Sequence, residues 1–98
     1  MTPLLLATAL LYFAASQAVD EARAFGVVIG RAQACDIDRG KWRAYQGRVE
    51  DYLDTIVIDE TDRADADAGL DEGIAIGRAD QRENQTYSCT SVEFDLEQ

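Results

Sequence analysis

The alternating aspartates of residues 62–73, DRADADAGLDEG, have the residue types and the close spacing of a calcium-binding loop. An EF-hand loop needs oxygen ligands at positions 1, 3 and 5, glycine at position 6 and glutamate at position 12. A loop that starts at Asp65 has Asp67 at position 3, but it has Leu70 at position 6 and Ile76 at position 12. On a helix, these two aspartates would point about 200° apart and could not share an ion. We therefore expect the acidic first turns of a helix here, and no metal site.

The sequence also contains few of the side chains that other kinds of catalysis need. The sequence has no histidine, which removes the commonest general base and the Ser-His and Cys-His nucleophile pairs. Lys41 is the single lysine and lies in no recognisable catalytic motif. Paired carboxylates can hydrolyse a glycoside, but we expect no pocket for a sugar between short helices. We predict a protein that is not an enzyme and has no cofactor.

The two cysteines, Cys35 and Cys89, are the remaining reactive side chains. In an oxidising compartment, an even number of cysteines predicts a disulfide. Closing a loop of about 55 residues should stabilise the fold by about 4 kcal/mol if the effect is chain entropy. A redox-active pair is the functional alternative, although the sequence contains no Cys-x-x-Cys motif.

The first eighteen residues, MTPLLLATALLYFAASQA, contain no charged side chain. Ser16 and Ala18 are small residues three and one before a candidate cut ahead of Val19, as in a secretory signal peptide. The alternative is an uncleaved membrane anchor. Residues 4–19 would extend about 24 Å as a helix, which is shorter than the roughly 30 Å hydrocarbon layer. We expect cleavage, and a periplasmic or secreted protein.

The remainder is divided into a helical domain over residues 19–90 and a C-terminal tail over residues 91–98. It carries the full net charge of −10. Nucleic-acid binding demands a basic face, so we exclude a nucleic-acid partner. An unknown protein partner is possible, and cationic partners are permitted. Membrane contact is expected only if the N-terminal helix is retained. A domain of this size has a marginal hydrophobic core.

Apolar residues recur at helical spacing in three segments. The segments start near Phe25, Trp42 and Ala66. Turn residues separate the first two, and Asp59 or Thr61 can cap the third. The expected core is Phe25, Ile29, Trp42, Tyr45, Val49, Tyr52, Leu53, Ile56, Leu70 and Ile74. In the tail, apolar and acidic residues alternate over 92–96, which leaves a strand, a short helix or a frayed end open.

Glycines stand four residues apart in the first and third segments, as Gly26 and Gly30, then Gly69, Gly73 and Gly77. Each costs roughly 1 kcal/mol relative to alanine inside a helix. Chance tolerance of glycine is one explanation. We favour the other, in which small residues let the first and third helices pack closely. An up-down-up arrangement would also bring Cys35 and Cys89 to the same end. The predicted fold is therefore a small all-α, three-helix up-down-up domain held by one disulfide.

A set of landmarks resembles one family. A helix ends in Cys35, Trp42-Arg43 follows, and YSCT occupies residues 87–90. This pattern resembles an uncharacterised family of small exported alphaproteobacterial proteins with a cysteine, a Trp-Arg pair, a Phe-Asn-x-Gly segment and a closing Tyr-x-Cys-Thr. The family's aromatic residue after the glycine is Ile74 here. The resemblance implies a helical periplasmic domain with one disulfide and no known activity.

The sequence thus predicts an exported, non-catalytic interaction or structural protein. One alternative is a periplasmic chaperone of the acid-stress type, because those proteins are similar in architecture: they are small, helical and hold one disulfide. Another alternative is a membrane-anchored accessory subunit whose N-terminal helix is not cleaved.

Overall fold

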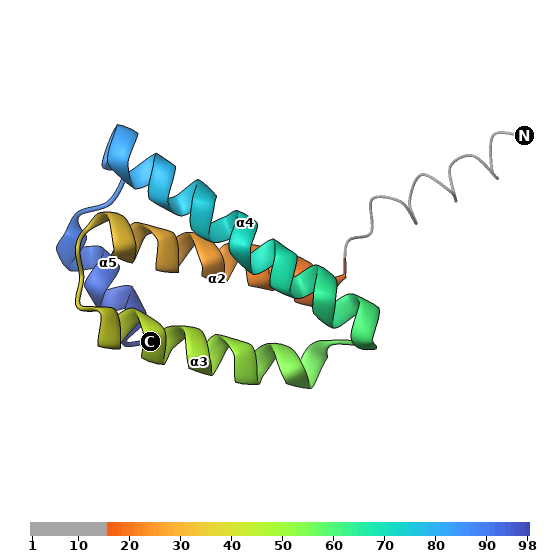
Figure 1. Ribbon diagram of the computed structural model, residues 1–98. Helices are drawn as coiled ribbons and strands as arrows, with labels where there is room; N and C mark the ends of the chain where they lie inside the picture. Colours follow the sequence, from red (N-terminus) through yellow and green to blue (C-terminus); the bar gives the residue numbers. More distant parts are fainter. Residues whose placement is uncertain (1–15) are drawn as a thin grey trace, which may run out of the picture.

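The computed structural model describes residues 16–98, and this part of the chain forms four α-helices and no strand. The helices are α2 (Gln17–Ala34), α3 (Arg39–Ile56), α4 (Glu60–Asn84) and α5 (Cys89–Leu96). Figure 1 shows α2 running toward the end of the molecule where α5 lies, α3 running back, and α4 returning beside α2. The prediction of an all-helical fold is confirmed. The sequence predicted three helices, whereas residues 16–98 form four.

Polar side chains fix where the helices begin. Ser16, Asp59 and Ser88 each accept a hydrogen bond from the backbone N–H three residues later, at 3.1, 2.8 and 3.1 Å. These are N-caps that satisfy otherwise unpaired donors. Of the two residues predicted to cap the third helix, Asp59 does so. Helices α2 and α4 end where Asp36 and Gln85 turn the chain in the left-handed region, with φ of 54° and 45°.

Helices α2 and α4 pack at backbone distance through their glycines, all of which are buried. A Cβ atom added to four of them would collide with a backbone carbonyl oxygen of the facing helix: Gly26 with Leu70, Gly30 with Ile74, Gly73 with Arg23 and Gly77 with Val27. At Gly69 the same atom would lie 3.1 Å from the carbonyl oxygen of Val19. Backbone cannot move aside as a side chain can, so the first four positions exclude every larger residue, whereas a small shift would be enough at Gly69.

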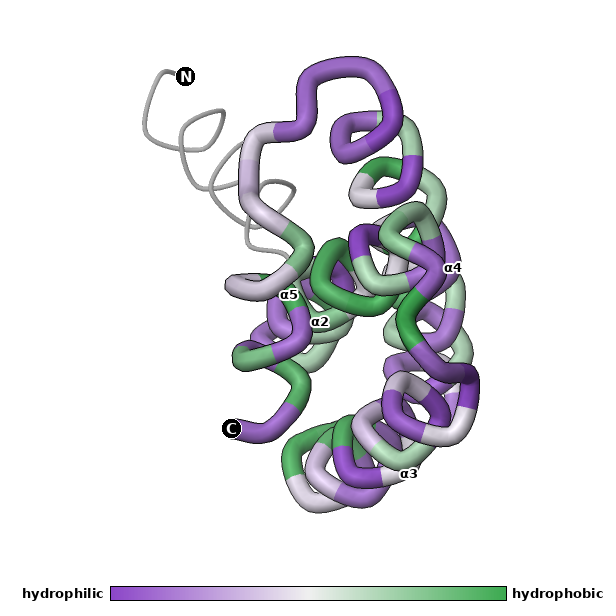
Figure 2. The backbone as a smooth tube through the Cα atoms, turned by 90° about the vertical axis from the view of Figure 1, so that its left-hand side faces the viewer, coloured by the Kyte–Doolittle hydropathy of each residue, from purple (hydrophilic) through white to green (hydrophobic). Residues whose placement is uncertain are grey.

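The remaining helices cover this pair. Helix α3 packs chiefly against α2, and α5 closes the end at which α2 and α3 meet. Figure 2 shows hydrophobic stretches of α2 between α4 and α5, whereas the end of α4 and the start of the turn after it are hydrophilic. The buried apolar core is Ala18, Ala22, Ile29, Ala32, Tyr45, Val49, Leu53, Ala66, Leu70, Val92 and Leu96.

The predicted core residues fall into three groups. Ile29, Tyr45, Val49, Leu53 and Leu70 are buried, and Phe25, Trp42, Ile56 and Ile74 pack against them while partly exposed. Tyr52 is 38% exposed and does not belong to the core. Its ring instead borders the groove described below.

The C-terminal segment is helical. Helix α5 crosses the expected boundary between domain and tail at residue 90. Val92 and Leu96 are four residues apart and both are buried, whereas Phe94 between them is 61% exposed. The alternation of apolar residues looked like a strand because it counts Phe94 with the other two. Only the helical pair reaches the core.

The predicted cut ahead of Val19 falls inside the first turn of α2. Ser16 caps this helix, and Ala18 is fully buried. Cleavage there would therefore remove a helix cap and a buried methyl group. The rest of the predicted signal peptide, residues 1–15, lies outside the described residues. None of the helices within residues 16–98 combines the length and the apolar composition that a membrane span requires.

Cys35 and Cys89 form a disulfide, with 5.6 Å between their Cα atoms. This prediction is confirmed. The bridge joins the residue that ends α2 to the first residue of α5. A disulfide is typical of an oxidising, non-cytoplasmic compartment.

Candidate functional site

An open groove lies where α2, α3 and the C-terminal end of α5 meet. It has a volume of about 390 Å³. We call it the aromatic groove, and it is lined by Phe25, Tyr45, Arg48, Val49, Tyr52, Asp95 and Gln98. Three aromatic rings on two helices give it a mostly apolar surface, which is the usual character of a binding site.

The rings are held in fixed positions. Phe25 meets Tyr45 edge-on, with centroids 6.3 Å apart, and meets Tyr52 in the same way at 6.0 Å. Such edge-to-face pairs are favourable. The Tyr52 hydroxyl donates to Glu21 at 3.0 Å, which anchors the outer ring to α2. This hydrogen bond raises the pKa of Tyr52, and burial raises the pKa of Tyr45.

Arg48 connects the groove to α5. Its Nη2 donates to the backbone carbonyl of Leu96 at 2.6 Å. This carbonyl lies in the last turn of α5, where carbonyl groups lack partners within the helix. The guanidinium carbon also lies 5.7 Å from the centroid of the Tyr45 ring. One side chain thus supports an aromatic wall of the groove and holds the end of α5.

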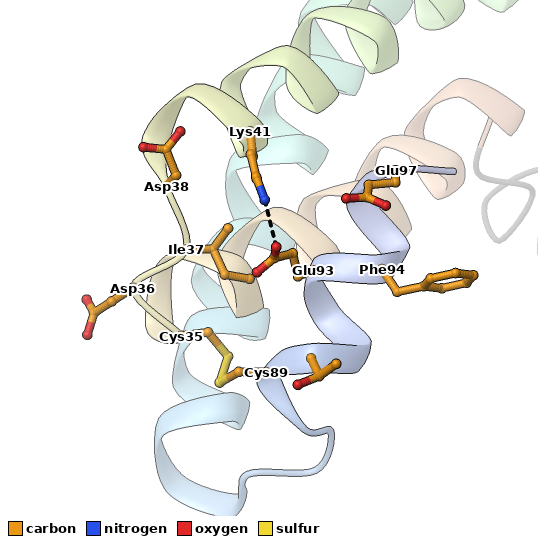
Figure 3. A pocket seen from close by; sticks show the side chains of 10 residues that line it. Cys35, Asp36, Ile37, Asp38, Lys41, Cys89, Glu93, Phe94 and Glu97 are labelled. Atoms are coloured by element: carbon orange, nitrogen blue, oxygen red, sulfur yellow. Dashed lines mark hydrogen bonds and ion pairs between the residues drawn. A yellow bond between two sulfur atoms is a disulfide. The ribbon is translucent and has the colours of Figure 1, made fainter.

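A second hollow, of about 650 Å³, lies beside the disulfide between the start of α3 and α5. Figure 3 shows Lys41 and Glu93 pointing toward each other across it, and Phe94 pointing away. The Lys41 ammonium donates to Glu93 at 2.6 Å, and this contact raises the pKa of Lys41. Because both partners are largely exposed, the pair adds little to stability.

Charge is distributed unevenly along the chain. Residues 50–72 hold ten of the nineteen acidic side chains and only one of the nine basic ones, Arg63. They form the second half of α3 and the first half of α4. Figure 1 places the turn between these helices at the end opposite α5. Nearly the whole net charge therefore lies at one end, which we call the acidic pole.

The aspartates that suggested calcium belong to this pole. Asp65 and Asp67 are exposed on α4, and Asp67 pairs with Arg63 at 3.3 Å. Arg63 also pairs with Asp54 of α3 at 2.6 Å, which sequence reasoning missed. Within residues 16–98, no three His, Cys, Asp or Glu side chains are placed to hold a metal ion.

The structure brings together some of the residues singled out in the sequence. The five glycines meet at the α2–α4 interface, and the two cysteines are bonded. Arg48 and Asp95 are groove residues that the sequence did not reveal. The sequence gives only an indirect indication for Arg48, which lies three residues after Tyr45 and four before Tyr52 and therefore on the same side of a helix.

Comparison with known proteins gives no match to a family model, a curated protein or a solved structure.

Proposed function

We propose that this protein is an exported, non-catalytic interaction module that binds a cationic, amphipathic segment of a partner protein in its aromatic groove. The observation that carries the proposal is the groove itself. Rigid aromatic rings present apolar surface at low entropic cost, and such residues dominate binding energy at protein interfaces. The net charge of −10 favours a partner of positive charge.

The surroundings of the groove support a cationic partner. Asp95 lines it and Glu21 borders it through Tyr52. Only Arg48 among the lining residues is basic, and its charge is engaged by the Leu96 carbonyl and the Tyr45 ring. The second half of α3 then leads into the acidic pole. An amphipathic helix would lay its apolar face on the rings and its basic residues toward these carboxylates.

A defined peptide pair tests the proposal. We expect a lysine- and leucine-rich amphipathic peptide to bind and to shift the NMR signals of Phe25, Tyr45 and Tyr52. The same peptide with every lysine replaced by glutamate should not bind. Binding by both peptides, binding by neither, or shifts confined to other residues would contradict the proposal.

Two variants locate the site. Replacing Tyr52 by serine removes a ring and its bond to Glu21, so it should weaken peptide binding about tenfold. Ile76→Ser is the matched control, because Ile76 is also exposed, at 47%, but does not line the groove. Equal losses in the two variants would exclude the groove as the binding site.

Export is tested separately by the intact mass of the protein isolated from its host. A mass that lacks the N-terminal residues supports cleavage, and the new first residue locates the cut. Retention of Met1 would support the anchored accessory subunit instead.

An acid-activated periplasmic chaperone is the second candidate. Two carboxylates that accept hydrogen bonds near the two ends of α4 favour this second function. A hydrogen bond from Ser16 lowers the pKa of Asp62, and one from Asn84 lowers the pKa of Asp80. Protonation at low pH breaks such contacts while the disulfide keeps the chain compact. A chaperone of this kind would suppress client aggregation near pH 2.5 and not at neutral pH; absence of protection at both would exclude it.

A further inference from the structure

The two cysteines of the disulfide are unequally exposed. Cys89 is exposed, whereas Cys35 is partly buried. Hollows of about 650 and 520 Å³ flank the bridge on two sides, and both cysteines line each of them. Figure 3 shows the bridge at the edge of the larger one. An incoming thiol can therefore approach Cys89 more readily than Cys35.

The two positions also differ in their electrostatics. Cys89 is the first residue of α5, after the cap Ser88. The N-terminal end of a helix stabilises a thiolate, which by itself would make Cys89 the better leaving group and favour attack on Cys35. Cys35 lies at the C-terminal end of α2, where the helix gives no such help. It receives instead a hydrogen bond from Gln81, whose Nε2 lies 3.5 Å from its sulfur.

Gln81 is built into this site. Its side chain is only 4% exposed, and its Nε2 also donates to the carbonyl of Tyr87 at 2.7 Å. Its Oε1 is buried and has no hydrogen-bond partner in the described part of the chain. An unpaired buried acceptor costs free energy, which the two hydrogen bonds of Nε2 must outweigh to hold the side chain in this place.

We propose that the Cys35–Cys89 bridge is a thiol-exchange site. The thiolate of a reducing partner attacks the Cys89 sulfur, a new S–S bond forms there, and the bond to Cys35 breaks. The electron pair leaves on the Cys35 sulfur, which Gln81 stabilises and which then takes up a proton. A second thiol of the partner resolves the mixed disulfide, so the partner is oxidised and both cysteines are reduced.

Exchange would release α5. This helix is attached by the bridge, by Val92 and Leu96, and by polar contacts from Lys41 and Arg48. A helix of eight residues is not stable alone. Its departure would remove Asp95 and Gln98 from the aromatic groove. Only this consequence for binding rests on the proposed function; the exchange chemistry does not depend on the groove.

Mapping the mixed disulfide on the folded, oxidised wild-type protein tests the proposal. Glutathione is added and the reaction is quenched with N-ethylmaleimide before peptide mapping. We expect glutathione on Cys89 and maleimide on Cys35, in roughly tenfold or greater excess over the reverse product. Equal labelling, the reverse distribution, or a bridge that glutathione does not open in the folded protein would overturn it.

Two further measurements sharpen the result. Gln81→Met should slow exchange about threefold to tenfold by removing the hydrogen bond to the leaving sulfur. Faster exchange would show that Gln81 only packs, and would overturn its role. A dithiol oxidoreductase whose resolving cysteine is replaced by serine should be trapped on Cys89; trapping at lower concentration than glutathione requires identifies a protein as the reductant, and the opposite order identifies a small thiol.

Discussion

The α2–α4 interface and the attachment of α5 hold the same small domain together by different means. Between α2 and α4 the contact is backbone against backbone, and glycines at both helices make it possible. Helix α5 is instead held by two apolar side chains, two polar contacts and one covalent bond. The first interface depends on the absence of side chains, and the second on the presence of particular ones.

This difference predicts how each region responds to change. A long close-packed interface gathers many small contacts, so it has no single critical side chain but tolerates no added atom. A short helix with few anchors can be released by breaking one of them. We therefore expect the packing of α2 on α4 to be sensitive mainly to added side-chain atoms. The attachment of α5 should depend mainly on the Cys35–Cys89 disulfide.

Removing the staple should have the largest effect. The double variant Cys35→Ser, Cys89→Ser should lose about 4 kcal/mol of unfolding free energy, measured by chemical denaturation. Hydrogen exchange should show that α5 now opens at a lower free energy than α2 and α4, whose amides lose no more protection than the global loss of stability explains. Equal opening free energies in all helices would contradict the comparison.

Crowding the close interface should come next. Gly73→Leu forces α2 and α4 apart, because its Cβ meets the Arg23 backbone, and should cost about 3 kcal/mol. Gly73→Ala should also destabilise, despite the higher helix propensity of alanine. Denaturation curves of both variants check this. If Gly73→Ala were neutral or stabilising, the backbone contact would not exist in solution.

Acid should weaken the contact between the starts of α2 and α4 to a smaller extent. The pKa of Asp62 is lowered in the folded protein, so its contribution to stability is present above the reference value of 3.8 and is lost as pH falls through the folded value. Asp62→Asn should flatten the dependence of the thermal midpoint on pH below about pH 4. Asp71→Asn, at an exposed site on the same helix, is the matched control.

The smallest predicted effect is a gain. Gly47 lies within α3, and a Cβ there would meet no other atom within 4 Å. Gly47→Ala should therefore stabilise the domain by about 1 kcal/mol through helix propensity alone. Chemical denaturation beside Gly73→Ala makes a matched pair of identical substitutions with opposite signs. Equal effects of the two would mean that helix propensity, and not packing, decides both.

The sequence revealed the interfaces to different degrees. Glycines spaced by four are a strong local signal, and they lie where close packing was expected. The anchors of α5 were hidden, because Phe94 completes an alternating pattern with Val92 and Leu96. The start of α2 was also hidden, since Ala18 follows the apolar stretch of residues 4–15 and was assigned with it to the predicted signal peptide. Tyr52 shares the helical spacing of core residues, and only its exposure in the structure shows that it does not belong to the core.

The uneven distribution of acidic residues has a kinetic consequence. A molecule whose negative charge lies at one end has a large electric dipole, which would orient it in the field of the proposed cationic partner before contact. The partner would be drawn first to the end opposite α5 and reach the aromatic groove along α3. Such steering raises the rate of association and not the lifetime of the complex. It should fade as added salt shortens the Debye length from about 30 Å at 0.01 M to about 8 Å at 0.15 M.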